Sequence, residues 1–237
     1  MRLDRFLANN TAFSRKEAKR LLKDARVFVE DVCISNPAFY VSEKDRVSID
    51  GEIISVLGPG YFMLNKPEGV VCANSDPMHP TIFDLLDVPH PELHVAGRLD
   101  IDTTGLVLIT GDGQWSHRVT SPRHECVKTY LVTTSEFITE QMIARLESGI
   151  FLEPEKIRTR PARIELLHPD CMLLHISEGK YHQVKRMLHA VGNAVDSLHR
   201  IQIGAICLDE TLAPGEYRPL TGSEVASVLN LIQQPMR

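Results

Sequence analysis

Residues 94–110, HVAGRLDIDTTGLVLIT, constrain the fold of this chain more than any other stretch. The last six letters, GLVLIT, are rich in branched aliphatic residues, which predicts a short buried β-strand. Gly97 and Gly105 bracket the polar segment before it, so that segment is predicted to be a loop that enters a rigid strand. Such a loop can display Arg98 and Asp100 without burying them unpaired. We therefore expect functional side chains in this loop.

Three other polar residues of the same loop have a simpler explanation. Asp102, Thr103 and Thr104 are expected to satisfy the backbone of their own loop, as short polar side chains commonly do in turns. Asp100 is interpreted differently, because later segments of the chain supply side chains that would act together with it.

Length and composition are those of a water-soluble globular protein. At 237 residues the chain is long enough for one large domain, or for one large and one small domain. No apolar run approaches the roughly 20 residues of a membrane helix, and the N-terminus lacks the apolar core of a signal peptide. The five cysteines are widely spaced and form no CxxC motif. This pattern favours reduced thiols in the cytoplasm over disulfides or a zinc site.

The net charge of −5 hides a basic N-terminal segment, since residues 1–26 hold eight Lys or Arg against three acidic residues. Residues 13–27 predict a helix that begins with a capping box of Ser14 and Glu17. Its buried stripe is predicted to be Ala18, Leu21, Leu22 and Ala25. Its other faces carry Arg15, Lys16, Lys19, Arg20 and Lys23. A solvated face would explain these cations, but five on one short helix favour contact with phosphates.

The rest of the first 57 residues predicts a small module. Residues 27–29 and 32–34 are expected to pair as strands across Glu30 and Asp31, and residues 47–49 run into an Asp-Gly turn. Through RLDRFLA, SRKEAKRLLK and RVFVEDVCI this segment resembles the S4 RNA-binding domain. One departure is that Glu30-Asp31 replaces the Asn-Gly or Asp-Gly turn usual in that family. The resemblance implies an RNA-binding domain over residues 1–57, followed by a linker at 58–60.

Residues 61–237 alternate between strand and helix patterns, which predicts an α+β domain. The predicted strands cover residues 61–64, 105–110, 128–134, 162–167 and 171–177. The predicted helices cover residues 112–119, 139–148 and 180–191, with a last helix that starts at a capping box of Thr221 and Glu224.

A second basic cluster lies on the predicted helix 180–191, away from its apolar stripe. It comprises His182, Gln183, Lys185, Arg186 and His189. This set suits an anion or nucleic-acid surface, although a solvated face explains it about as well. Tyr130 lies inside a predicted strand, where an aromatic side chain is normally part of the core.

Three segments together resemble the pseudouridine synthases of the RsuA type. They are GRLDIDTTGLVLIT, TSPRHECVKTYLV and ISEGKYHQVKRM, flanked by YFMLNKPEG and LAPGEYRPLT. The resemblance implies a catalytic domain built on a mixed, mostly antiparallel sheet with flanking helices, after a small S4-like α/β domain. It further implies a monomeric cytoplasmic enzyme that acts on 16S ribosomal RNA at the 516 site, or on large-subunit rRNA.

The resemblance also implies roles for particular residues. Asp100 takes the place of the family's catalytic aspartate, and Tyr130 that of the tyrosine that stacks on the target uracil. Lys185 falls where relatives carry a cation that pairs with the aspartate, although its neighbour Arg186 could fill that place. Arg98 matches an arginine that some relatives insert where the target base has left the stack. With these, His182, Gln183 and Arg186 are expected to contact RNA.

Pseudouridine formation suits these side chains. The reaction is an isomerisation, so no cofactor is expected, and it needs an ionised carboxylate beside a cation and a base outside the helix. A hydrolase would instead pair Asp100 with Asp102 or Asp112. A ribosome-assembly protein would only bind rRNA through its first domain. A metal site at His117, His124 and Cys126 is the weakest alternative, because their spacing is not that of familiar ligands.

Overall fold

The computed structural model describes the chain except for residues 12, 43–44, 55–59, 88–92, 154 and 230–237. Contacts divide the chain into two compact units, which we call the first and second unit. The first unit contains Met1–Gly60 with Asp87–Leu93, and the second contains Tyr61–Leu86 with His94–Arg237. The predicted linker at 58–60 falls largely outside the described residues. None of the helices within the described ranges is long and apolar enough to cross a membrane.

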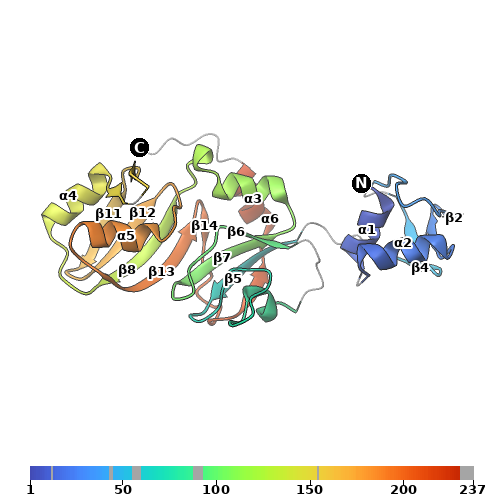
Figure 1. The fold of residues 1–237 in the computed structure, drawn as a ribbon, viewed down its shortest axis with the longest axis horizontal. Helices are drawn as coiled ribbons and strands as arrows, with labels where there is room; N and C mark the ends of the chain where they lie inside the picture. The colour runs from blue at the N-terminus through green and yellow to red at the C-terminus, as the bar shows by residue number, and fades with distance from the viewer. Residues whose placement is uncertain (12, 43–44, 55–59, 88–92, 154, 230–237) are drawn as a thin grey trace. The chain divides into compact units, whose positions relative to one another are not determined.

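The first unit consists of two helices packed on a four-stranded antiparallel sheet of order β2-β1-β3-β4 (Figure 1). The capping box is confirmed: Ser14 Oγ accepts from the Glu17 N–H, and the Glu17 carboxylate accepts from the Ser14 N–H. The core of this unit gathers Leu3, Phe6, Leu7, Ala18, Leu21, Leu22 and the inward valines. Its elements are α1 (Leu3–Asn10), α2 (Arg15–Lys23), β1 (Val27–Val29), β2 (Val32–Cys33), β3 (Val47–Ile49) and β4 (Glu52–Ile53).

Two details of this unit depend on left-handed backbone. Glu30 and Asp31 both have positive φ, +47° and +66°, so they form a tight hairpin turn without the expected glycine. The predicted β1–β2 pairing is thereby confirmed. Ala25 was predicted on the buried stripe of the helix, and this is wrong. The helix ends at Lys23, and Ala25 is exposed with φ +56° because the chain turns there towards β1.

The second unit is built on one mixed sheet with the strand order β11-β12-β8-β13-β7-β5-β15. Only β13 and β7 pair in parallel, and every other pair described in this sheet is antiparallel. The predicted mixed, mostly antiparallel sheet is therefore confirmed. Its strands are β5 (Tyr61–Lys66), β6 (His94–Ala96), β7 (Thr104–Thr110), β8 (Lys128–Thr134), β11 (Arg163–His168), β12 (Cys171–Ile176), β13 (Val195–Ile203), β14 (Ile206–Cys207) and β15 (Tyr217–Pro219).

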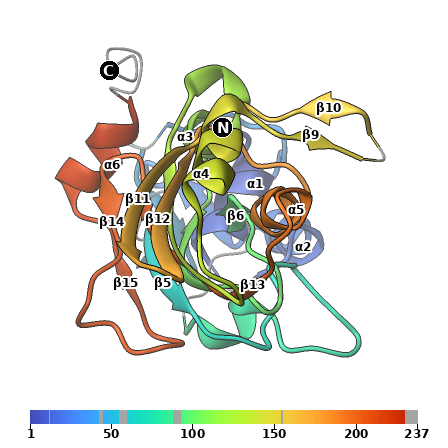
Figure 2. The same cartoon turned by 90° about the vertical axis from the view of Figure 1, so that its left-hand side faces the viewer.

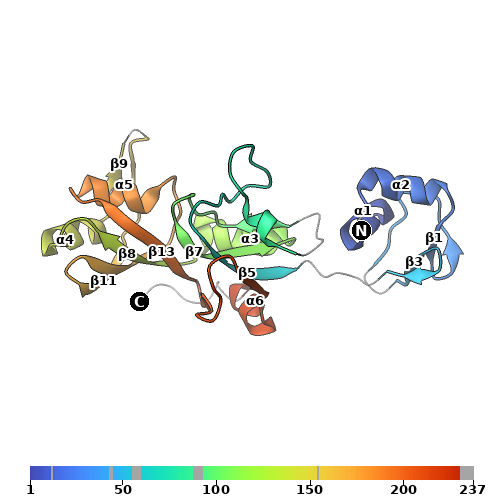
Figure 3. The ribbon, with the colours of Figure 1, turned by 90° about the horizontal axis from the view of Figure 1, so that it is seen from below.

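Helices flank this sheet, and α5 and α6 lie on opposite sides of the strands in Figure 2. A separate hairpin of β9 (Phe151–Leu152) and β10 (Ile157–Arg158) lies beside α5, as Figures 2 and 3 show. The helices are η1 (Ile82–Leu85), α3 (Gly113–Thr120), η2 (Pro122–His124), α4 (Glu140–Ser148), α5 (Gln183–Ala190) and α6 (Gly222–Leu229). The predicted helix at 180–191 thus begins three residues late, because His182 takes a left-handed conformation with φ +46°.

Strand β13 has no counterpart among the sequence predictions, yet it is the longest strand and runs between β8 and β7. Its residues, VDSLHRIQI, mix charged and apolar side chains without a clear alternation. The strand is held by pairing on both sides, antiparallel with β8 and parallel with β7. It therefore joins the two halves of the sheet, and this junction is where the cavity described next is found.

Candidate active site

The second unit contains a cavity of about 420 Å³ that collects residues from five separate parts of the chain. Its walls come from β6 and the loop after it, from the end of α3, from β8, from the β12–α5 segment and from β13. Asp100, Tyr130 and Lys185, which the sequence predicted as catalytic, all line it. Arg98, His182 and Gln183 line it as well. A cavity of this size suits a small organic group such as a nucleoside.

The loop that carries Asp100 is held where it enters β7 by close packing and by hydrogen bonds. Gly105 has φ +98°, and a Cβ placed there would lie 2.4 Å from the backbone oxygen of Arg200. Only glycine lets β7 approach β13 this closely. In addition, the buried ammonium of Lys66 on β5 donates to the carbonyls of Ile101 and Thr103 at 3.2 and 2.8 Å. The loop is therefore held rigidly where it presents Asp100.

Two cationic or titratable side chains face the Asp100 carboxylate, whose side chain is 32% exposed. Lys185 Nζ lies 3.7 Å from Oδ2, and His182 Nε2 lies 3.4 Å from Oδ1. The Lys185 ammonium also donates to Asp102 Oδ1 at 2.5 Å, and this bond lowers the pKa of the Asp102 carboxyl. Asp102 was expected to cap its own loop. Its carboxylate bonds its own backbone N–H and also the ammonium of Lys185 on α5, so Lys185 lies between two carboxylates.

Arg186, the alternative partner of Asp100, forms its ion pair with a different carboxylate, that of Glu155. Its guanidinium donates to the carbonyl of Glu153 at 2.7 Å. It also donates to the carbonyl of Tyr181 at 3.1 Å. Arg186 therefore fastens the β9–β10 hairpin to α5, while Lys185 is the neighbour that faces Asp100.

Tyr130 and Arg200 form the inner wall of the cavity. They are paired residues on the adjacent strands β8 and β13. Arg200 is 2% exposed, and its Nη1 lies 3.5 Å from the Tyr130 hydroxyl. The same guanidinium donates to the carbonyls of Leu106 and Gly97 at 2.8 and 2.7 Å. Sequence reasoning did not find Arg200, because nothing in its local pattern marks it as more than a polar residue. It connects the Tyr130 wall to the start of the Asp100 loop.

Gln183 was predicted on the exposed face of the helix, and this placement is wrong. It is 4% exposed, and its amide donates to Glu178 Oε1 at 2.9 Å and accepts from the Lys180 N–H at 2.8 Å. Burial alone would raise the pKa of Glu178, but hydrogen bonds from Lys180, the Arg160 N–H and Gln183 lower it. These residues form an internal polar network that shapes the turn before α5.

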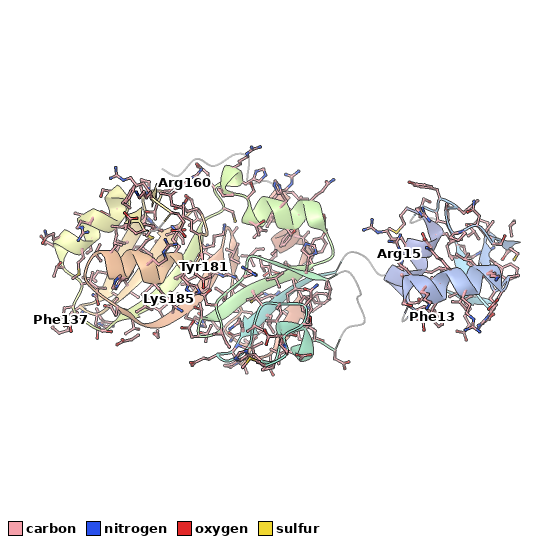
Figure 4. The ribbon with its side chains drawn as sticks, in the orientation of Figure 1. Phe13, Arg15, Phe137, Arg160, Tyr181 and Lys185 are labelled. Atoms are coloured by element: carbon pink, nitrogen blue, oxygen red, sulfur yellow. The ribbon has the colours of Figure 1, made fainter. Side chains whose placement is uncertain are left out.

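The remaining predicted RNA contacts lie at the surface. Arg98 is exposed at the cavity. The five basic residues predicted on α2 are all exposed in the first unit, where Arg15 approaches Asp4 and Arg20 approaches Asp24, each at 3.8 Å. They are Arg15, Lys16, Lys19, Arg20 and Lys23 (Figure 4 labels Arg15).

The hydrolase alternative is not supported by the positions of the carboxylates. Asp112 caps α3 by accepting from the N–H groups of Gln114 and Trp115, and it accepts from the Tyr61 hydroxyl at 2.9 Å. It does not line the cavity as far as the structure describes it. Asp102 is held by Lys185. Of these three aspartates, Asp100 is the one that lines the described cavity, together with Tyr130 and the buried Glu178. In the described part of the chain, no three His, Cys, Asp or Glu side chains gather as metal ligands.

Comparisons with known proteins agree with this geometry. Residues 60–190 match the family model described as RNA pseudouridylate synthase. A "Ribosomal small subunit pseudouridine synthase A" of Salmonella typhimurium is 55% identical over 96% of this chain and 100% of its own length. The Escherichia coli protein of the same name is 53% identical over 97% of this chain and 100% of its own length.

A solved structure agrees as well. The "Crystal structure of pseudouridylate synthase" superposes with a TM-score of 0.70 and 47% identity, over 96% of this chain and 99% of that one. The family model covers more than half of the chain, and the two relatives match it over nearly their whole length. This chain therefore belongs to the RNA pseudouridylate synthase family.

Proposed function

We propose that this RNA pseudouridine synthase converts one uridine of 16S small-subunit rRNA to pseudouridine, at the 516 site, with Asp100 as the catalytic carboxylate. The observation that carries the proposal is the placement of Asp100, Lys185 and Tyr130 around one cavity. The choice of rRNA is supported by the small-subunit name shared by relatives at 53–55% identity. Large-subunit rRNA is the alternative substrate.

The reaction breaks the N1–C1′ bond, turns the uracil and joins C5 to C1′, while the proton on C5 is exchanged for one on N1. Asp100 in its ionised form attacks the nucleoside or removes a proton from it. Lys185 Nζ and His182 Nε2 lie 3.7 and 3.4 Å from the oxygens of this carboxylate and can hold it in position. Since the isomerisation is redox-neutral, it needs no redox cofactor.

The uridine must leave its helix before Asp100 can reach it. Unstacking a base costs a few kcal/mol. The ring of Tyr130, at the inner wall of the cavity, can return about 1–3 kcal/mol by stacking on the extruded uracil. Arg98, exposed at the cavity, is proposed to occupy the place that the base vacates. Its guanidinium can hydrogen-bond to the bases or phosphates left behind.

The direct test is to incubate the protein with unmodified 16S rRNA and to map pseudouridine by carbodiimide treatment and primer extension. We expect one new stop, at the 516 site. Unmodified 23S rRNA, incubated in parallel, is the control. A stop only in the 23S rRNA would show that the family assignment is right and the substrate wrong.

Lys185→Met is expected to lower kcat at neutral pH at least tenfold. At about 4 Å and an effective dielectric of about 20, a cation interacts with a carboxylate by on the order of 4 kcal/mol before desolvation. Removing it leaves the Asp100 carboxylate without the ammonium that pairs with it, and a single-turnover assay at neutral pH measures the loss. Arg186→Met removes a contact of α5 with the β9–β10 hairpin and not one with Asp100, so it should lower kcat far less. The opposite pattern would assign the pairing role to Arg186.

We further propose that the first unit is an S4-like domain whose helix α2 binds rRNA phosphates. Replacing Lys16, Lys19 and Lys23 by Gln should weaken rRNA binding. The slope of log K against log salt should become shallower by about 0.7–0.9 for each lost phosphate contact. Lys156→Gln removes one exposed charge from the β9–β10 hairpin and serves as the control. If the triple variant keeps the wild-type salt slope, α2 is only a solvated surface.

A further inference from the structure

Tyr181 lines the mouth of the cavity, and its side chain is 70% exposed. Its ring stacks on the ring of His182, with centroids 3.8 Å apart and planes 20° from parallel. The His182 ring in turn approaches Asp100, with 3.4 Å between Nε2 and Oδ1. One face of the Tyr181 ring is therefore covered by an imidazole next to the catalytic carboxylate, and most of the rest is open to solvent. Figure 4 shows Tyr181 close to Lys185.

The backbone holds this ring pair in a fixed position. His182 has φ +46° and ψ 37°, a left-handed conformation that is uncommon outside glycine, although histidine adopts it more often than most residues. Hydrogen bonds on both sides of His182 hold the backbone here. The Gln183 amide oxygen accepts from the Lys180 N–H at 2.8 Å, and Arg186 donates to the Tyr181 carbonyl at 3.1 Å. The pair is thus preorganised before any ligand arrives.

The chemistry around Tyr181 fits a single strand of RNA. Proteins bind unpaired strands with exposed aromatic rings that stack on bases and with cations that follow the phosphates. Lys185 and the exposed Arg98 supply cations at the same cavity. An exposed tyrosine adds little to the core, because most of its apolar surface is not buried. Its position is therefore better explained by a ligand than by folding.

We propose that Tyr181 stacks on the base of a nucleotide next to the target uridine, while Tyr130 receives the target base itself. This inference rests on the proposed function, since it takes RNA as the ligand of this cavity. Each of two aromatic rings then binds one nucleotide. Tyr130, which is buried on β8, binds the target base, and Tyr181, which is exposed before α5, binds the neighbouring base. A flanking base that stacks on Tyr181 would help to keep the target uridine extruded and would contribute to the choice of sequence.

The test combines protein variants with modified RNA. The full-length protein acts on a 16S fragment that carries the target uridine, either intact or with an abasic site at its 5′ or 3′ neighbour. Tyr181→Ala is expected to raise KM about tenfold on intact RNA, which corresponds to about 1.4 kcal/mol of lost stacking. Its kcat should change little. One of the two abasic RNAs should raise KM of the wild type similarly, and combining it with Tyr181→Ala should add nothing further.

Two control variants separate stacking from other effects. Tyr181→Phe keeps the ring and should retain the wild-type KM. Phe137→Ala truncates another aromatic side chain of the second unit that is also 70% exposed and does not line this cavity in the described structure. Figure 4 shows Phe137 well away from Tyr181. It should change KM on none of the RNAs, and neither alanine variant should shift the midpoint of urea unfolding.

Three results would overturn the inference. Additive effects of Tyr181→Ala and the abasic site at both neighbours would exclude stacking on either base. An unchanged KM with an equal loss of kcat on intact and abasic RNA would show that Tyr181 only positions His182. Failure of the wild type to form pseudouridine in the intact fragment would refute the proposed function, and this inference with it.

Discussion

Asp100→Asn is expected to abolish pseudouridine formation while leaving the fold and rRNA binding intact. The amide is nearly isosteric with the carboxylate, but it can neither attack the nucleoside nor accept its proton. Since Asp100 is partly exposed, the free energy of unfolding should change by no more than about 0.5 kcal/mol. Single-turnover assays of pseudouridine formation and equilibrium urea unfolding measure the two effects separately.

Asp102→Asn is the matched control for this prediction. It lies two residues away, and its carboxylate binds the same ammonium group of Lys185. Without the Asp102 charge, Lys185 can still pair with Asp100, so the arrangement around Asp100 is kept. We therefore expect activity to fall by less than about tenfold, which corresponds to about 1.4 kcal/mol of transition-state stabilisation. Appreciable turnover by Asp100→Asn, together with a dead Asp102→Asn, would transfer the catalytic role to Asp102.

Arg200→Met is expected to lower both stability and activity strongly. The substitution roughly keeps the buried volume but leaves the carbonyls of Gly97 and Leu106 without their donors. An unsatisfied buried polar group costs about 1–3 kcal/mol, so unfolding should become easier by about 2–5 kcal/mol. Because the Asp100 loop starts at Gly97, kcat should also fall at temperatures where the variant remains folded. Thermal unfolding and kcat at low temperature are the two measurements.

Arg200→Lys distinguishes the geometry of the guanidinium from its charge. Lysine keeps the positive charge, but its single ammonium cannot replace the planar set of donors that reaches two carbonyls at once. We expect it to restore only part of the stability and less of the activity. Full recovery with lysine would mean that Arg200 acts mainly through charge on Tyr130 and its surroundings. A wild-type unfolding curve for Arg200→Met would contradict the structural role altogether.

Local sequence signals determined most of the secondary structure. Capping boxes placed the starts of α2 and α6, and both are present as hydrogen bonds at Ser14 and Thr221. Short aliphatic or alternating runs predicted β5, β7, β8, β11 and β12. These signals work because capping and side-chain periodicity depend on residues within one turn or one strand. The loop between Gly97 and Gly105 was also predicted to display functional side chains, and its Asp100 lines the cavity.

The tertiary structure decided which polar side chains meet. Arg200 lies about a hundred residues from Gly97 and belongs to a strand whose sequence has no clear period, so local patterns could not place it. Lys185 and Arg186 are neighbours on one helix, and in the folded chain Lys185 approaches Asp100 while Arg186 pairs with Glu155 on the β9–β10 hairpin. The resemblance of short sequence motifs to a known family predicted the chemistry, and such motifs can be recognised without the tertiary structure. Only the packed sheet decided the partner of each charge, because pairing across strands brings together residues that are far apart in the chain.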